Sequence, residues 1–263
     1  MPTTSNFFIE TWGLHDMAHA TVEPTIPASQ SDALLPEPSK QDTLSLRDFR
    51  DLVANMPVSP QAFTSKWSTW ASHMSGDGTA AASRTIFGES SEVITLSRSD
   101  LRHLAANEDQ AQFVMATIIW GYPRGMRGNN VANLIGRFDA LISLLADVRG
   151  KQVEDWKSHY AQLASISGVG LSTYTKFLTF LSVSIHGHNA LILDDRIIRI
   201  AQSGIFQELA PLHGLKNAVH SYPRYLECMH SLAGDLAVSA EQLEFFLFEF
   251  GLNLKSSRFA AMR

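Results

Sequence analysis

The chain has 263 residues, of which 45% are hydrophobic and 18% charged, so it can bury one large core or two small cores that share a cleft. The net charge of −5 argues mildly against a nucleic-acid partner, although one basic face would be enough to bind one. A single cysteine, Cys228, excludes an intramolecular disulfide and any four-cysteine metal site. We expect a cytoplasmic protein with no membrane-spanning segment and no signal peptide.

The first 44 residues are predicted to form an extension to the folded body, and the first 15 of these residues could dock on it. Residues 1–15 form a short amphipathic stretch, and residues 21–41 carry four prolines among small polar residues, which is typical of an extended linker. We therefore divide the chain into an N-terminal extension with a Pro-rich linker over 1–44 and a helical body over 45–263.

The body is predicted to be mostly α. Ser45 opens a first helix, and residues 74–90, rich in glycine, serine and alanine, are expected to form a loop. A strand or two is expected near 85–96, and a buried helix over 109–120.

A loop over 121–130 is dense in glycine, arginine and asparagine. Arg124 and Arg127 could contact phosphates, whereas Asn129 and Asn130 could enter a duplex or simply cap the following helix. That helix is predicted to run unbroken over Val131–Val148, with apolar residues at three-and-four spacing. A further helix is expected over 153–163.

The segment over 165–200 carries the strongest signal. The hairpin Gly168-Val169-Gly170 can form a tight turn, and the helix after it would present free N–H groups to an anion. That apolar helix is expected to start near Thr175, and an apolar run then delivers Asp194. The alternative is an ordinary turn between two helices. The remaining helices are expected over 197–201, 218–233 and 240–253.

Lys176 and Asp194 are candidate catalytic residues. A lysine in an apolar helix is costly unless it has a partner or a task, and burial favours the neutral, nucleophilic form of an amine. The competing interpretation is a surface lysine with Asp194 as a helix N-cap, which is compatible with catalysis. The histidines near 186–188 and at His230 lack metal-ligand spacing, so we expect no metal site.

Gly168-Val169-Gly170, Lys176 and the run Leu191–Asp194 resemble the helix–hairpin–helix DNA glycosylases, in particular the bacterial 8-oxoguanine DNA glycosylase-like branch. The resemblance covers roughly 115–250 and implies two helical lobes around a DNA-binding cleft. One departure stands out. The family places its lysine two residues after the second hairpin glycine, where this chain has Ser172. Alignment on the glycines favours Ser172, whereas alignment on the aspartate favours Lys176, which we adopt.

The resemblance also implies roles for other residues. DNA contacts are assigned to Gly168, Gly170, Ser172, Arg124, Arg127, Asn129, Asn130 and Asn133. The asparagines match the family segment that fills the gap left by an extruded base, although the family has an arginine where this chain has Asn133. The base pocket is assigned to Trp120, Tyr122, Gln242 and Phe246.

The sequence thus predicts a monomeric, cofactor-free DNA glycosylase that acts on double-stranded DNA with a damaged or modified base. Attack by Lys176 would give a Schiff base and strand cleavage, whereas a water nucleophile would leave only an abasic site. The base would be 8-oxoguanine-like, or a hypermodified phage base such as a modified cytosine, in which case the role is antiviral defence. The alternatives are a non-catalytic helix–hairpin–helix DNA-binding module and an all-α protein that binds another protein.

Overall fold

The computed structural model describes residues 43–74, 77–88, 91–107, 109–163 and 165–254. The chain divides into two compact units, 1–40 and 41–263. The amphipathic stretch and linker predicted for the N-terminal region lie outside the described residues, so the proposed division at residue 44 stays a prediction.

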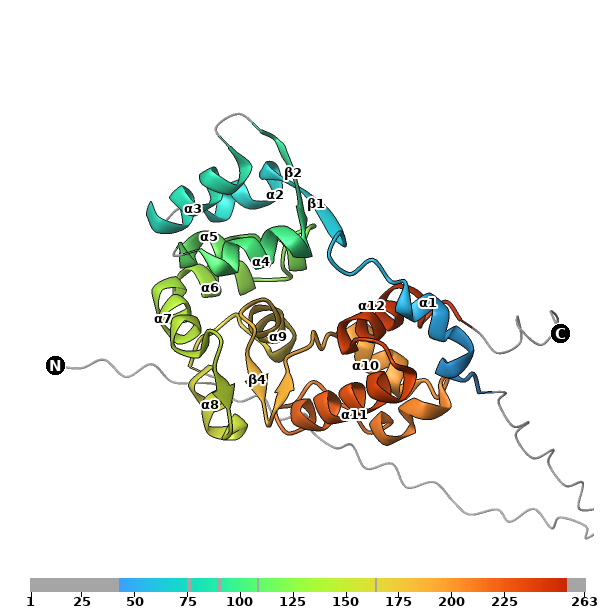
Figure 1. The fold of residues 1–263 in the computed structure, drawn as a ribbon. Coiled ribbons are helices and arrows are strands. Elements are labelled where there is room, and N and C mark those ends of the chain that lie inside the picture. The colour runs from blue at the N-terminus through green and yellow to red at the C-terminus, as the bar shows by residue number, and fades with distance from the viewer. Residues whose placement is uncertain (1–42, 75–76, 89–90, 108, 164, 255–263) are drawn as a thin grey trace, which may run out of the picture. The chain divides into compact units, whose positions relative to one another are not determined.

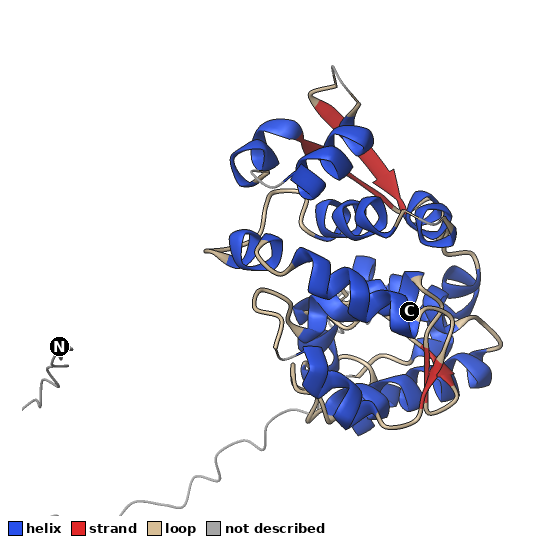
Figure 2. Ribbon diagram, turned by 90° about the vertical axis from the view of Figure 1, so that its left-hand side faces the viewer, coloured by secondary structure: helices blue, strands red, loops and turns tan. Residues whose placement is uncertain are grey.

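The described part is mostly helical, with strands confined to small sheets (Figures 1 and 2). The helices are α1 Arg50–Ala54, α2 Trp67–Trp70, α3 Asp77–Phe87, α4 Arg98–Ala106, α5 Gln110–Gly121, α6 Asn130–Ile135, α7 Phe138–Val148, α8 Trp156–Leu163, α9 Leu171–Phe180, α10 Asp195–Gln202, α11 Ser221–Leu236 and α12 Ala240–Phe250. Short 3₁₀ turns cover Leu46–Phe49, Ala71–His73 and Gln207–Leu212. Among these residues, no helix is long and apolar enough to cross a membrane.

Two small sheets connect the helices. Strands β1, Ala62–Lys66, and β2, Val93–Ser97, pair antiparallel with Ala62 opposite Ser97. In the second sheet β3, Gln152–Val153, runs parallel to β4, Ser184–Ile185, which pairs antiparallel with β5, His188–Asn189.

The helices fall into two groups (Figure 1). Helices α3 and α4 pack on α5, which also contacts β1 and β2, whereas α1, α10 and α11 pack on α12. Helix α9 packs against α4 and α5. Helix α5 is buried continuously from Phe113 to Trp120 because its apolar residues cover every face. Its rings pack edge-on against α9, with Phe113–Phe177 centroids 6.1 Å apart and Trp120–Phe180 centroids 5.4 Å apart.

Several predicted elements differ in the structure. The expected loop over 74–90 contains α3, which is helical because its alanines pack on α5. The helix predicted over Val131–Val148 is broken after Ile135 at Gly136 and Arg137. Helix α9 begins at Leu171, not near Thr175, and uses Gly170 as its N-cap. Strand β1 was not predicted, whereas β2 lies in the expected region.

Candidate active site

A cavity of about 180 Å³ lies where the two helix groups meet. Its polar lining consists of Gln61, Arg98, Lys176, Asp194 and Glu244. Its apolar lining consists mainly of Phe63, Trp120, Pro123, Ile192 and Phe248. These residues come from β1, α4, α5, α9, α12 and the segment before α10, so both predicted catalytic residues meet in one cavity.

Lys176 is buried in α9, with 6% of its surface exposed. Its Nζ donates to the Ser172 carbonyl oxygen at 2.9 Å and to Ser172 Oγ at 3.1 Å, and it faces the Tyr122 ring at 5.4 Å. Residues four apart lie on one helix face, and these bonds hold Ser172 beside Lys176, which lines the cavity. The residues favoured by the two sequence alignments are therefore direct neighbours.

The hydrogen bonds of Lys176 leave one direction free. The tetrahedral Nζ has three positions besides its bond to Cε, and Ser172 accepts hydrogen bonds from two of them. Since the side chain also lines the cavity, the third position is available to a ligand there.

Asp194 is the N-cap of α10. Its Oδ1 accepts a hydrogen bond of 3.0 Å from the Ile197 N–H, and a carboxylate at a helix N-terminus is electrostatically favourable. Its second oxygen accepts no hydrogen bond from the described residues. One carboxylate oxygen is therefore structural, while the other is available at the cavity.

The extended segment before Asp194 is held by two tyrosine side chains of α11. The Tyr222 hydroxyl bonds both the N–H and the carbonyl of Leu191, at 3.2 and 2.8 Å, and Tyr225 donates to the Ile192 carbonyl at 2.9 Å. Burial raises the pKa of Tyr222 and Tyr225 well above the usual value, so both remain neutral donors. These bonds satisfy a buried backbone that has no strand partner.

Arg98 and Glu244 form a buried ion pair that sequence reasoning missed. Arg98 Nη1 and Nη2 donate to the two carboxylate oxygens at 3.1 and 3.0 Å, and Arg98 Nε donates to Gln61 Oε1 at 2.5 Å. Both side chains of the ion pair are 1% exposed. Burial alone lowers the pKa of Arg98, but the charge and hydrogen bonds of Glu244 outweigh it and raise the pKa. The sequence carried a signal for it, because Glu244 is a charged residue between the apolar Leu243 and Phe245. A charged residue in an apolar helix was also the reason to single out Lys176.

Two of the four predicted base-pocket residues lie at the cavity or at Lys176, and the other two do not. Trp120 lines the cavity, and Tyr122 contacts Lys176 while its hydroxyl bonds Thr173 Oγ1 at 2.6 Å. Gln242 instead caps α12 by accepting from the Ser239 N–H at 2.9 Å, and donates to the Ala54 carbonyl at 2.6 Å.

Phe246 is fully buried against Phe49 and Phe206, with ring centroids 5.5 and 6.2 Å away. Neither Gln242 nor Phe246 lines the cavity; Glu244 and Phe248, two positions further along α12, do. Two helical residues span about 200° of rotation, so this shift moves from one face of the helix to the other.

The hairpin lies against the asparagine segment. Gly168 has φ +92°, and a Cβ there would lie 2.6 Å from the Asn130 carbonyl oxygen and 2.9 Å from the Leu134 nitrogen, so only glycine fits. Gly170 has φ −88° and open space around it, so neither its conformation nor its surroundings require glycine.

The predicted DNA-contact residues of the preceding loop and α6 are exposed. They are Arg124, Arg127, Asn129, Asn130 and Asn133. Within the described ranges, neither arginine forms an ion pair or a hydrogen bond to another residue. Two exposed guanidinium groups and three exposed amides therefore lie in this loop and α6, and Gly168 of the hairpin lies against α6.

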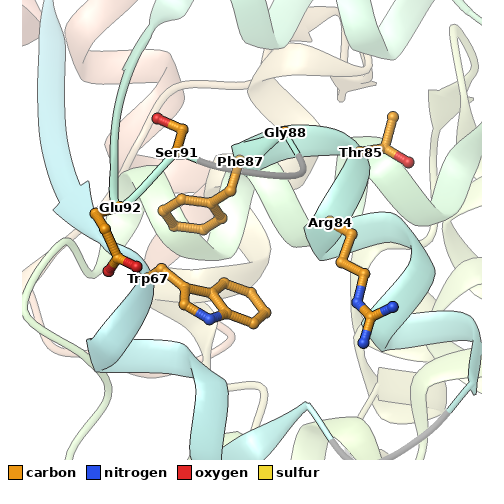
Figure 3. A pocket seen from close by; sticks show the side chains of 7 residues that line it. All are labelled: Trp67, Arg84, Thr85, Phe87, Gly88, Ser91 and Glu92. Atoms are coloured by element: carbon orange, nitrogen blue, oxygen red, sulfur yellow. The ribbon is translucent and has the colours of Figure 1, made fainter.

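A larger pocket of about 680 Å³ lies elsewhere (Figure 3). The Trp67 and Phe87 rings, which pack edge-on with centroids 5.4 Å apart, line this pocket together with Arg84 and Glu92 (Figure 3). None of the predicted site residues lines it. We therefore place the site in the smaller cavity, which combines a buried amine, a carboxylate and aromatic walls.

Residues 56–248 match the family described as "Putative 8-oxoguanine DNA glycosylase OGG-like protein". This match covers most of the chain and includes every predicted site residue, so the protein belongs to that family. Searches of curated proteins and of solved structures found no match.

Proposed function

We propose that the protein is a DNA glycosylase that extrudes a damaged or modified base from duplex DNA and cleaves its N-glycosidic bond, leaving an abasic site. The observation that carries the proposal is that Lys176 and Asp194 line one cavity with aromatic walls. Membership of the 8-oxoguanine glycosylase-like family supports the same reaction. An extruded base in the cavity would bring its sugar to these two side chains.

Asp194 is proposed to stabilise the sugar during bond cleavage. When the C1′–N bond breaks, the electron pair leaves with the base and positive charge develops on the sugar ring. The carboxylate oxygen of Asp194 that is not used in capping can stabilise that charge, as carboxylates do in glycoside hydrolysis generally. Since the carboxylate is fixed by α10, it needs little reorganisation.

Lys176 is proposed to supply the nucleophile or to position it. If its lone pair attacks C1′, a C–N bond forms, the amine loses a proton, and ring opening gives a Schiff base that permits strand cleavage. If Lys176 instead orients a water molecule, the water oxygen bonds C1′ and the product is an abasic site alone. The hydrogen bonds to Ser172 hold the amine in place for either role.

Duplex DNA is proposed to bind across the hairpin and the loop before α6, in a cleft between two helical lobes. The N-terminus of α9 after Gly168 and Gly170 would contact a phosphate, as would Arg124 and Arg127. Asn129, Asn130 and Asn133 would fill the gap left by the extruded base. The contact of Gly168 with α6 supports this assignment because it joins both elements.

The proposed substrate is an 8-oxoguanine-like base, or a hypermodified phage base such as a modified cytosine. The first implies a role in DNA repair and the second a role in antiviral defence. A panel of duplexes that each carry one such base, scored for abasic sites by alkaline strand cleavage, separates the two.

Borohydride reduction tests the nucleophile and with it the proposed reaction. We expect wild-type protein to be trapped covalently on a substrate duplex and Lys176→Gln not to be. Excision without any trapped adduct would assign the attack to water. Failure to release any base from the whole panel would contradict the proposed function.

A further inference from the structure

Four residues that line the cavity carry polar groups with no role in the reaction described above. They are Gln61, which precedes β1, Arg98 of α4, Trp120 of α5 and Glu244 of α12. They are buried, with exposed fractions from 8% at Gln61 to 0% at Glu244. Buried polar groups are normally hydrogen-bonded, so their remaining bonding capacity indicates what they can bind.

The unused capacity consists mainly of donors. Gln61 Oε1 accepts from Arg98 Nε, which fixes the amide orientation, and the Gln61 Nε2 group donates to no described residue. The buried Trp120 Nε1–H also finds no partner among the described residues. Three N–H groups of Arg98 are bound, and a guanidinium has five.

The carboxylate of Glu244, the acceptor among the charged groups of this set, already accepts hydrogen bonds from Arg98. Both Glu244 oxygens bind the Arg98 guanidinium, which offsets the carboxylate charge. Glu244 has no exposed surface, whereas Gln61 keeps 8%. The donors left without a partner among the described residues are therefore the amide of Gln61 and the indole N–H of Trp120, and both residues line the cavity.

We infer that the cavity selects a base whose inserted edge presents carbonyl oxygens, with Gln61 and Trp120 as the specificity-determining donors. The inference rests on the proposed function, because it assumes that an extruded base enters this cavity. A carbonyl oxygen on the base would accept hydrogen bonds from these otherwise unpaired N–H groups. An amino group at the same position is itself a donor and would leave them unpaired. Sites built to hydrogen-bond one group reject an analogue that lacks it, because their buried polar groups are left unpaired.

The test uses pairs of bases that differ by one carbonyl or amino group. One pair is 8-oxoguanine and 8-oxo-2,6-diaminopurine, and the other is 5-hydroxymethyluracil and 5-hydroxymethylcytosine. Each base is placed in the same duplex beside 2-aminopurine, whose fluorescence rises when its neighbour unstacks. Full-length Asp194→Asn protein is used so that binding is measured without excision.

We expect the carbonyl member of at least one pair to bind about tenfold more tightly than the amino member. Gln61→Glu keeps the oxygen that accepts from Arg98 but replaces the donor by an acceptor, and Trp120→Phe removes the indole N–H. Each should reduce this ratio to near one. Comparing ratios between proteins cancels the stability of the duplexes themselves.

Gln112→Glu is the control, since Gln112 does not line the cavity and its change should leave the ratio intact. A wild-type ratio near one with a clear unstacking signal, or an unchanged ratio in both cavity variants, would overturn this inference while leaving the proposed function standing. No unstacking signal with any of the four bases would overturn both.

Discussion

At the scale of single residues, the position of Lys176 depends on Gly121. A Cβ at Gly121 would lie 2.9 Å from Lys176 Cδ and 3.1 Å from Cε, so the lysine chain would have to shift. Gly121→Ala should therefore move the amine from Ser172 and lower the excision rate. Fold stability should change little because the atoms that move belong to a flexible side chain.

Gly234→Ala is the matched change in α11, where a Cβ meets nothing within 4 Å. We expect it to stabilise the protein by about 0.5–1 kcal/mol, because alanine is the better helix former, and to leave excision unchanged. Excision assays and thermal unfolding measure both variants. Equal excision by the two would refute the positioning role of Gly121.

Side-chain chemistry and the family resemblance together selected Lys176 and Asp194, and the fold brings both to one cavity. Their chemical roles stay predictions. Gln242 and Phe246 were assigned by family spacing, but the face of α12 that meets the cavity depends on how that helix packs, which spacing does not determine. Arg98 was missed because its partner Glu244 lies 146 positions away.

At the scale of elements, one side chain joins α9 to the segment that carries Asp194. Thr175 Oγ1 accepts from the Leu193 N–H at 3.1 Å and donates to the Ser172 carbonyl at 3.2 Å. Thr175→Val leaves a buried N–H without an acceptor, at a cost of about 1–3 kcal/mol. We expect the excision rate to fall as well, because the lost hydrogen bond connects the neighbour of Lys176 to the neighbour of Asp194.

Thr175→Ser controls for this change because it keeps the hydroxyl and loses only a methyl group. It should retain more activity than Thr175→Val, and urea unfolding should separate the cost in stability from the effect on rate. If the valine variant excises at the wild-type rate, the Thr175–Leu193 hydrogen bond does not position Asp194.

Hydrophobic patterning located most helices but not their ends. The break at Gly136 and Arg137 was hidden because apolar spacing continues across it, from Leu134 to Phe138. Helix α3 was masked by its glycine and serine content, which tertiary packing on α5 overrides. In contrast, Ser45 was predicted to open the first helix, and its side chain accepts from the Arg47 N–H at the start of the Leu46–Phe49 turn.

At the scale of the whole molecule, the Arg98–Glu244 pair links the two helix groups, since α4 packs on α5 and α12 packs with α1, α10 and α11. Glu244→Gln leaves a buried guanidinium without its counter-charge and should destabilise the fold by about 3–5 kcal/mol. The double variant Arg98→Met with Glu244→Leu removes both charges and should cost much less. Urea unfolding at neutral pH measures this, and equal losses in the two proteins would contradict the linking role.

The mostly helical class of the body was predictable because apolar periodicity is a local property. The meeting of β1, α4, α5, α9 and α12 in one cavity was not, because it depends on contacts between residues far apart in sequence. Of the residues that line the cavity, Lys176, Asp194 and Trp120 were predicted from the sequence. The lysine was recognisable because an amine is costly in an apolar helix, and the other two came from the family resemblance.

The central claim is that Asp194 stabilises the sugar as the base leaves, and its neighbour Asp195 provides the control. Asp195 is exposed and pairs with Arg199 at 3.1 Å, and it does not line the cavity. The deciding measurement is the single-turnover excision rate of Asp194→Asn and Asp195→Asn on the substrate duplex. We predict a loss of about 100-fold or more for the first and wild-type activity for the second. Equal rates for the two variants would contradict the account.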